Sequence, residues 1–230
     1  MTLADEEFVR RRTTEVTLRD GTRVLLRPIL PSDKSLLIDG FRRLSPESRY
    51  RRFMGPIEEL SDSQVRFLTE VDYVDHFAWV ALDPDAPGEP GIGVARYVRV
   101  PGEPEVAEAA VTVVDEYQGR GVGSLLLEAL GAMAVENGIT RFRGYALEDN
   151  RPLREVLRGL DVSTTHDSPG VLRVEIDLPG RAEGIRGSPL AKVLGAVARG
   201  DGPVLLRLDQ LSADATGRGG SAPRTSDRLC

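Results

Sequence analysis

The sequence predicts a mixed α/β (α+β) protein in which helices flank a central, mostly antiparallel sheet. Two observations support this fold class. The middle of the chain alternates apolar strand patterns with turns that contain proline and glycine, which is typical of an antiparallel meander. The chain then continues as strand, glycine-rich turn, apolar helix and strand. We therefore expect a mixed sheet with helices packed against it.

The first expected elements lie before the meander. Thr22 to Pro28 predicts an edge strand that ends at the proline, and Ser32-Asp33 predicts the cap of a following helix. A basic run comes next, and it consists of Arg42, Arg43, Arg49, Arg51 and Arg52. We expect this run either to attract an acidic protein surface or a phosphate group, or to be a solvated helix face.

The meander is expected to contain three strands. His76 to Leu82 and Gly91 to Val100 predict the first two, which are separated by a loop with three prolines. Ala107 to Val114 predicts the third strand and carries small or apolar residues on both faces, as expected at the centre of a sheet. Glu108 is the one charged residue inside this strand.

A buried helix follows the meander. Apolar residues recur at spacings of four, three and four from Val122 to Met133, and further apolar residues widen this surface until little polar face remains. Asn137-Gly138 predicts a left-handed end to the helix. Thr140 to Leu147 predicts the next strand.

The turn between the third strand and this helix carries the functional signal. Its residues are Gln118, Gly119, Arg120, Gly121, Val122, Gly123 and Ser124. Glycines leave no Cβ between the main chain and a ligand, so successive N–H groups can face an anion, and the start of the helix adds its positive end. A Walker phosphate loop is excluded because no lysine lies nearby, and the spacing fits a dinucleotide-binding turn poorly. A glycine-rich turn with only a packing role is the alternative.

The pattern Gln-Gly-Arg-Gly-Val-Gly, placed after Val113-Val114 and before a leucine-rich helix, resembles the acetyl-coenzyme A signature of the GCN5-related N-acetyltransferases (GNAT). The segments Phe41 to Met54 and Val71 to His76 resemble the subgroup of bacterial protein-lysine acetyltransferases. The resemblance implies the GNAT fold, with a central sheet of about six or seven strands, and acetyl-CoA as co-substrate.

The resemblance also implies a set of site residues. The expected cofactor-binding residues are Val113, Val114, Gln118, Gly119, Arg120, Gly121, Val122, Gly123, Ser124 and Asn150. Backbone N–H groups near Val113 and Val114 are expected to polarise the thioester carbonyl. Asn150 is expected to contact the pantetheine or phosphate region, and the alternative is a plain helix N-cap.

Transfer to an amine also requires a proton acceptor, because a lysine amine with a pKa of about 10.4 is protonated at neutral pH. A carboxylate partly removed from water is suited to this task. The resemblance places Glu108 at the position of the general base, and the alternative is a glutamate that reaches solvent or pairs with an arginine. Relatives often have a tyrosine as general acid between Asn150 and Val162, and this chain has none there. Tyr117 and Tyr145 are interpreted as packing residues, so no acid is assigned.

Composition narrows the other possibilities. A net charge of −6 argues against general nucleic-acid binding. The charged N-terminus and the lack of a long apolar run predict a cytoplasmic protein without membrane contact. His76 and His166 are the only histidines, so no metal site is expected. The single cysteine, Cys230, is terminal, which argues for direct transfer without a covalent intermediate.

These expectations define a domain organisation and a function. Residues 1–14 are expected to be an N-terminal extension, 15–178 the GNAT domain, 179–211 a partly ordered extension and 212–230 a disordered tail. The favoured function is transfer of an acetyl group from acetyl-CoA to a primary amine, with a protein lysine as acceptor. A small-molecule amine is the alternative acceptor. A non-catalytic acetyl-CoA-binding regulatory module is the alternative class, because the tyrosine is missing and Leu160-Asp161-Val162 stands where relatives show Leu-Gly-Phe.

Overall fold

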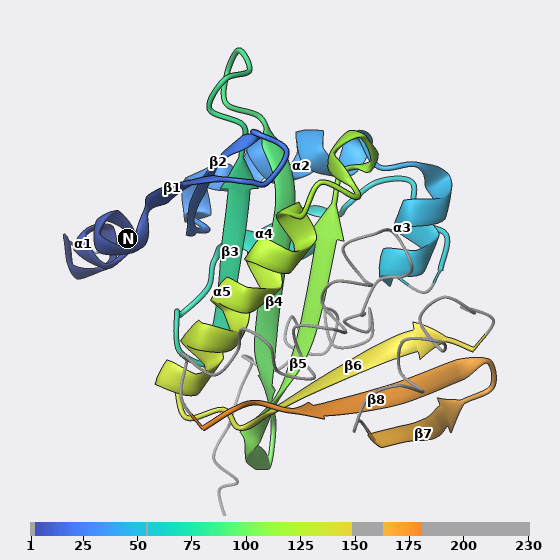
Figure 1. Ribbon diagram of the computed structural model, residues 1–230. Coiled ribbons are helices and arrows are strands. Elements are labelled where there is room, and N and C mark those ends of the chain that lie inside the picture. Colours follow the sequence, from blue (N-terminus) through green and yellow to red (C-terminus); the bar gives the residue numbers. More distant parts are fainter. Residues whose placement is uncertain (1–2, 54, 149–162, 181–230) are drawn as a thin grey trace, which may run out of the picture.

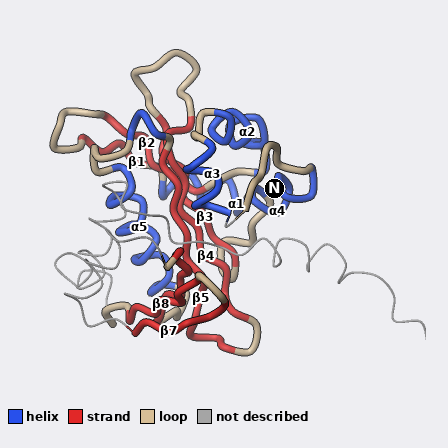
Figure 2. The backbone as a smooth tube through the Cα atoms, turned by 90° about the vertical axis from the view of Figure 1, so that its right-hand side faces the viewer, coloured by secondary structure: helices blue, strands red, loops and turns tan. Residues whose placement is uncertain are grey.

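The computed structural model describes residues 3–53, 55–148 and 163–180, in which an eight-stranded mixed sheet has helices on both faces (Figures 1 and 2). The strand order is β1-β2-β3-β4-β5-β6-β8-β7, and of these neighbouring pairs β5 and β6 are parallel while the others are antiparallel. The predicted mixed, mostly antiparallel sheet is therefore confirmed, with more strands than the six or seven expected.

The strands are β1 (Thr14–Thr17), β2 (Arg23–Pro28), β3 (His76–Leu82), β4 (Gly91–Val100), β5 (Glu103–Val113), β6 (Arg141–Leu147), β7 (Ser163–Ser168) and β8 (Val171–Asp177). The helices are α1 (Leu3–Arg12), α2 (Lys34–Arg42), α3 (Pro46–Phe53), α4 (Asp62–Thr69) and α5 (Val122–Glu136), with short 3-10 helices at Pro31–Asp33 and Asp115–Tyr117. The predicted bounds of β3 and β4 are confirmed.

The prediction that Thr22 to Pro28 is an edge strand is wrong, because β1 pairs with the outer side of β2. The two strands form a hairpin in which Leu18 N donates to Thr22 O (2.8 Å) and Gly21 takes a positive φ of 88°. β5 also begins earlier than predicted, at Glu103, because Gly102 (φ 83°) turns the chain tightly after Pro101.

Asp33 differs from its expected role as the cap of the following helix. Its carboxylate makes no capping bond to α2. It accepts two hydrogen bonds from Arg27, at 2.7 and 2.8 Å, and one at 2.7 Å from Leu30 N, which is the backbone group at the start of the 3-10 helix Pro31–Asp33. The bonds to Arg27 link the end of β2 to the start of α2. Asp33 therefore caps the 3-10 helix and also fixes the course of the chain between β2 and α2.

The helices form two layers on opposite faces of the sheet. Figure 2 shows α5 on one side of the sheet and α2 to α4 on the other. The α1 helix lies near the end of α5, where Arg12 Nη2 donates to Glu136 Oε2 at 3.1 Å. The α1 helix lies in the predicted N-terminal extension, yet Val9 is part of the main core. As predicted, α5 is buried, with Leu126 and Leu130 fully inaccessible, and Gly138 (φ 75°) follows its end.

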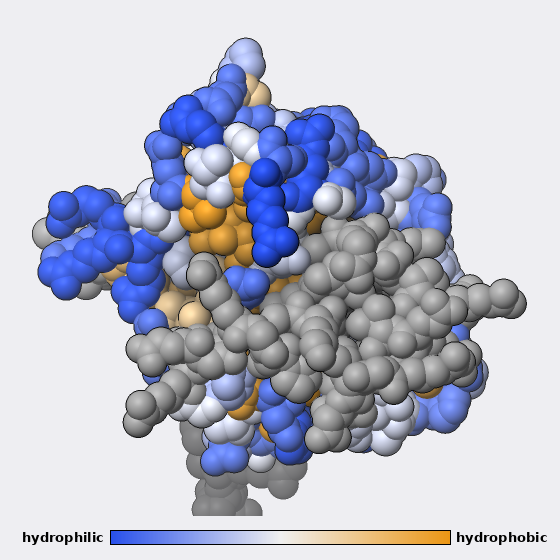
Figure 3. Space-filling view, in the orientation of Figure 1, coloured by the Kyte–Doolittle hydropathy of each residue, from blue (hydrophilic) through white to orange (hydrophobic). Residues whose placement is uncertain are grey.

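The outer side of α5 remains apolar. Figure 3 shows an apolar area on the face of the molecule where α5 packs, bordered by hydrophilic residues. Partly buried residues of α5 that contact the core are Leu125, Ala129, Ala132 and Val135. This agrees with a helix sequence that has little polar face.

The pairing of β5 with β6 is short. The parallel register joins Val106 to Arg141, Ala107 to Phe142 and Glu108 to Arg143. Beyond this point β6 diverges from β5 and continues with β8 and β7 as a separate layer (Figure 1). The edge of β5 that faces β6 is thus not paired with that strand after Glu108.

Some sequence predictions lie outside the described residues. They are the helix expected to open at Glu148 and contain Asn150, the part of the C-terminal extension from residue 181 onward, and the tail from residue 212 onward. Their roles stay predictions.

Gly93 in β4 allows α5 to approach the sheet closely. A Cβ built at this position would lie 2.9 Å from Leu126 Cδ1 and 3.1 Å from Thr112 O. We therefore expect Gly93→Ala to lower the free energy of unfolding by about 1–3 kcal/mol, because the helix must shift to relieve the contact. Urea denaturation measures this change. Gly40→Ala in α2, where the nearest atom would be 4.0 Å away, serves as control, and an equal loss in both variants would contradict the close-approach explanation.

Candidate active site

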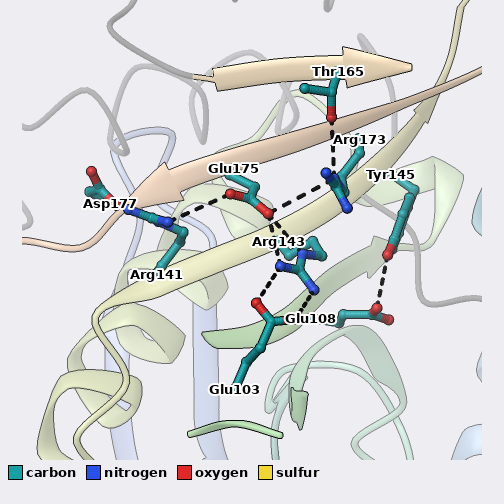
Figure 4. Close-up of polar contacts among 9 residues, drawn as sticks. All are labelled: Glu103, Glu108, Arg141, Arg143, Tyr145, Thr165, Arg173, Glu175 and Asp177. Carbon is teal, nitrogen blue, oxygen red and sulfur yellow. Dashed lines mark hydrogen bonds and ion pairs between the residues drawn. The ribbon is translucent and has the colours of Figure 1, made fainter. Parts of the chain in front are cut away.

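Glu108 lies at the point where β5 and β6 separate. Glu108 is 2% exposed, which excludes the alternative of a glutamate that reaches solvent. The Tyr145 hydroxyl on β6 donates a hydrogen bond to Glu108 Oε1 at 3.0 Å (Figure 4). The interpretation of Tyr145 as a packing residue was therefore incomplete, because its hydroxyl bridges from β6 to the carboxylate of β5.

The carboxylate of Glu108 belongs to the face of the sheet that α2 and α4 cover. Side chains alternate along β5, so Glu108 and Thr112 share a face, and Thr112 is paired with Val94 of β4. Gly93, the neighbour of Val94, faces α5 instead. The candidate base and the helix of the glycine-rich turn therefore lie on opposite faces of β5.

A group of ion pairs holds β6 where it leaves β5. Arg143 donates to both carboxylate oxygens of Glu103, at 2.9 and 2.8 Å, and to Glu175 Oε1 at 2.9 Å. Glu103 is on β5 and Glu175 on β8, so this guanidinium links three strands (Figure 4). The hydrogen bond to Glu103 raises the pKa of Arg143 above its usual range and lowers the pKa of Glu103. The geometry around Glu108 is thereby fixed by charge-assisted bonds.

The glycine-rich turn is attached to the start of α3. Asp115 accepts hydrogen bonds from Ser45 N (3.1 Å) and Ser48 Oγ (2.7 Å). Sequence reasoning did not identify Asp115 or these serines as supports of the turn. Ser45 and Ser48 lie in the segment that resembles protein-lysine acetyltransferases, so that segment positions the turn.

The side chain of Gln118 braces the turn from inside. Its Nε2 atom donates to Val113 O and to Asp115 Oδ1, both at 3.1 Å, and its backbone N–H donates to Asp115 O at 3.2 Å. These donors are thus used within the protein, and the expectation that Gln118 contacts the cofactor stays a prediction. Its role is to hold the turn against the end of β5.

The remaining residues of the turn have the geometry of an anion site. Gly119 and Gly121 take positive φ values of 75° and 99°, and nothing lies within 4 Å of a Cβ built on either. The first hydrogen bond of α5 runs from Leu125 N to Gly121 O at 3.0 Å, so the N–H groups of Val122 and Gly123 have no acceptor within the helix. The N-terminus of a helix with such donors favours a phosphate.

The other charged residue of the turn is Arg120. Its guanidinium lies 5.0 Å from the centre of the Tyr117 ring, and the side chain is exposed. Tyr117 donates in turn to Asp83 in the loop between β3 and β4. Ser124 lies in the first turn of α5 with Val122 and Gly123. Contacts of all these residues with a cofactor stay predictions.

Val113 and Val114, at the end of β5, differ in the direction and the hydrogen bonding of their backbone N–H groups. Val114 N donates to Ile92 O at 3.0 Å, so this N–H is used within the sheet and does not fit the predicted contact with a thioester. Antiparallel strands alternate the direction of successive amides, so the N–H of Val113 points away from β4, toward the edge that β6 leaves. Val113 remains the candidate for polarising the carbonyl, and the expectation that Val114 contacts the cofactor stays a prediction.

His76 has a structural role on the same face as Glu108. Arg96 donates from Nη1 to His76 Nε2 at 3.0 Å, and the Phe67 ring lies 4.6 Å from the imidazole. Burial and then the charge of Arg96 lower the pKa of His76 well below 6.5. Within the described part of the chain no three metal-binding side chains gather, and the expectation that no metal binds stays a prediction.

Comparison with known proteins identifies the family. The model of the acetyltransferase (GNAT) domain matches residues 23–162. The chain belongs to this family. The GNAT fold that the glycine-rich pattern implied is thereby confirmed, and β5, the turn and α5 lie within the matched residues.

Individual relatives agree with the GNAT assignment. Acetyltransferase Pat of Mycolicibacterium smegmatis is 39% identical over 164 residues, which are 71% of this chain and 48% of that protein. The GNAT domain of S. lividans PAT has 34% identity and a TM-score of 0.63, over 72% of this chain and 97% of that domain. A cAMP-binding acyltransferase from Mycobacterium smegmatis has 29% identity and a TM-score of 0.51, over 87% of this chain and 62% of that one.

The match to Pat is partial in length. This chain spans about half the length of that relative. In the ranges that the structure covers, none of the helices has the length and apolar character needed to cross a membrane.

The lowered pKa of His76 predicts a pH-dependent stability. The folded protein favours the neutral imidazole, so this contribution is fully present above about pH 6.5 and is lost as the pH falls below that value. We expect His76→Gln, whose amide oxygen can still accept from Arg96, to remove part of this pH dependence. The slope attributable to one histidine is at most about 1.4 kcal/mol per pH unit.

Urea denaturation between pH 5 and pH 8 measures this effect. His166→Gln is the control, because the side chain of His166 is 73% exposed. Identical pH profiles for wild type and His76→Gln would contradict the assignment of this titration to His76.

Proposed function

We propose that this protein is an acetyl-CoA-dependent N-acetyltransferase that transfers the acetyl group directly to a primary amine. The observation that carries this proposal is the buried carboxylate of Glu108 at the divergence of β5 and β6, on the strand that runs into the glycine-rich turn. Membership of the GNAT family supports it. The proposed catalytic unit is residues 15–178, and the proposed location is the cytoplasm.

The residues present fit acetyl-CoA. A diphosphate fits the turn because Gly119 and Gly121 adopt conformations that favour glycine, and because Val122 and Gly123 present N–H groups at the start of α5. A pantetheine chain carries amide groups. Beyond Glu108, the side of β5 that no longer pairs with β6 offers amide partners of the kind that a neighbouring strand would use. The cofactor supplies the activated thioester.

Glu108 is proposed to remove a proton from the acceptor ammonium group. The neutral amine then attacks the thioester carbonyl, the C–N bond forms, the C–S bond breaks, and the new amide nitrogen releases its extra proton to solvent. The thiolate takes a proton from solvent, since its pKa of about 8.5 makes it an adequate leaving group. The N–H of Val113 is proposed to stabilise the oxyanion that forms during the attack.

A protein lysine is the proposed acceptor. Two findings support this choice. The relative with 39% identity is named acetyltransferase Pat, and the segment from Phe41 to Met54, which resembles protein-lysine acetyltransferases, holds the glycine-rich turn through Ser45 and Ser48. A small-molecule amine is the alternative acceptor and is included in the test below.

Glu108→Gln tests the role of the carboxylate. Glutamine can still accept the hydrogen bond from Tyr145 but cannot act as a base at neutral pH. We expect kcat to fall about 10²- to 10⁴-fold while the affinity for acetyl-CoA stays unchanged. Release of CoA, measured with lysine-containing proteins and with small amines, gives kcat, and calorimetry gives the affinity.

The matched control for this experiment is Glu105→Gln, which changes an exposed glutamate of the same strand. It should leave kcat unchanged. Turnover by Glu108→Gln equal to that of wild type would remove Glu108 as the base. Binding of acetyl-CoA by the wild type without transfer to any acceptor would instead favour a regulatory module.

Gly121→Ala tests the turn. A residue with a Cβ at a φ of 99° costs about 1–2 kcal/mol, so the turn should relax and its N–H groups should lose their alignment. We expect the affinity for acetyl-CoA, measured by calorimetry, to fall at least about tenfold. Gly102→Ala introduces the same kind of strain (φ 83°) between β4 and β5, at the end of β5 opposite to the turn, and should leave the affinity unchanged. Equal affinities in all three proteins would exclude this turn as the phosphate site.

A further inference from the structure

A cavity lies between the sheet and the helices α2 to α4. Its volume is about 70 Å³. One water needs about 10–15 Å³ on this scale, so the cavity has room for several waters or a small organic molecule. Most of the lining is apolar and includes Leu37 and Phe41, but Arg52 from α3 and Arg96 from β4 also line it. Two guanidinium groups in an apolar cavity are unusual and need a physical explanation.

Both guanidinium groups are buried and incompletely hydrogen-bonded. Arg52 is 5% exposed and Arg96 is 1% exposed. Arg96 donates to His76 Nε2 and to Leu68 O (2.9 Å), yet its Nε atom has no hydrogen-bond partner among the described residues. In the same part of the chain Arg52 Nη1 also has none.

No described carboxylate neutralises these two charges. Asp33 lines the same cavity, but its oxygens already accept from Arg27 and from Leu30 N. The imidazole that accepts from Arg96 is neutral, because its pKa lies well below 6.5. Within the described ranges neither Arg52 nor Arg96 forms an ion pair.

The two arginines nevertheless remain charged at neutral pH. Burial, followed by the charge of Arg52, lowers the pKa of Arg96 to about 9, and burial lowers the pKa of Arg52 to about 10. Both values lie above neutrality, so two like charges share a medium of low polarity. Such an arrangement is costly unless an anion compensates it.

We propose that this cavity binds a small carboxylate, with the carboxylate group between Arg52 and Arg96 and an aliphatic body against the apolar lining. Guanidinium groups are planar and match the geometry of a carboxylate. Thr112 Oγ1 also lines the cavity, and this buried hydroxyl has no partner in the described chain, so it offers a further donor. The largely apolar lining disfavours a phosphate or sulfate, whose several charged oxygens would each need a donor.

The position of the cavity relates it to acceptor binding. Thr112 lies on the same strand and the same face as Glu108, so the carboxylate would bind on the side of the sheet that holds the proposed base. The carboxylate then comes either from the acceptor itself or from a separate small metabolite. Only the first source rests on the proposed function, and the binding experiment below requires no transfer activity.

Calorimetry of the full chain with butyrate, in the absence of acetyl-CoA, tests the site. Butyramide is the matched probe, because it has nearly the same shape without the charge. We expect one butyrate to bind per chain and no saturable binding of butyramide. Arg52→Gln should weaken butyrate binding at least tenfold, whereas Arg66→Gln, which changes an exposed arginine of α4, should leave it unchanged.

Two results would overturn the proposal: no saturable heat with butyrate, or equal affinities for wild type and Arg52→Gln. If Arg52→Gln does not fold, side-chain NMR signals of Arg52 and Arg96 in the wild type replace it. They should shift with butyrate and not with butyramide, and signals that butyrate leaves unchanged would equally refute the site.

Steady-state kinetics distinguishes the two sources of the carboxylate. Butyrate that competes with the acceptor but not with acetyl-CoA indicates that the acceptor carries the carboxylate. Inhibition or activation that is not competitive with either substrate indicates a separate metabolite. Both patterns presuppose the binding shown by calorimetry.

Discussion

The separation of β5 from β6 is the constraint on which the candidate site depends. The two strands share only the pairs from Val106–Arg141 to Glu108–Arg143, and then they diverge. If the parallel pairing of β5 with β6 continued, the amides of β5 beyond Glu108 would form hydrogen bonds with β6. Because the ladder stops there, the Val113 N–H faces an edge that no described strand pairs with, and Glu108 lies at the point where this edge begins.

Buried charge is handled in two different ways in this molecule. Arg143 at the divergence lies between Glu103 and Glu175, and each of its three guanidinium nitrogens donates to a carboxylate. Arg52 and Arg96, beneath α2 to α4, have donors without acceptors in the described chain. The first arrangement stabilises the shape of the site, since charge-assisted bonds to two carboxylates fix the relative positions of three strands. The second is explained by a ligand.

The sequence predicted those parts of the fold that rest on local patterns. β3 and β4 were predicted with the observed bounds because proline and glycine delimit them, and α5 was predicted from its apolar periodicity. β1 was not predicted because Thr14–Thr17 has a single apolar residue, so the segment lacks the alternation of apolar and polar residues that indicates a strand. Whether β2 lies at the edge depends on that missed partner.

The sequence predicted the residue types of the candidate site better than it predicted the contacts that these residues make. Glu108 is the one charge in the strand predicted from Ala107 to Val114, and the glycines of the turn are recognised by their spacing. The hydrogen bonds that Gln118 and Val114 make depend on strand register and turn geometry, which composition does not encode. Arg52 belongs to a run interpreted as a surface feature, and only the packing of α3 shows that its guanidinium is buried. Tyr145 lies far from Glu108 in sequence, so no pattern connects them.

The hydrogen bond from Tyr145 to Glu108 also acts as a spacer. Tyr145 is on β6 beyond the last paired residue, so its hydroxyl bridges the gap between two strands that no longer touch through their backbones. An ionised carboxylate accepts such a bond more strongly than a protonated one. In the proposed reaction each proton that Glu108 takes up therefore weakens the bridge across the opening. In that reaction, the strength of the link between the two strands depends on whether Glu108 is ionised.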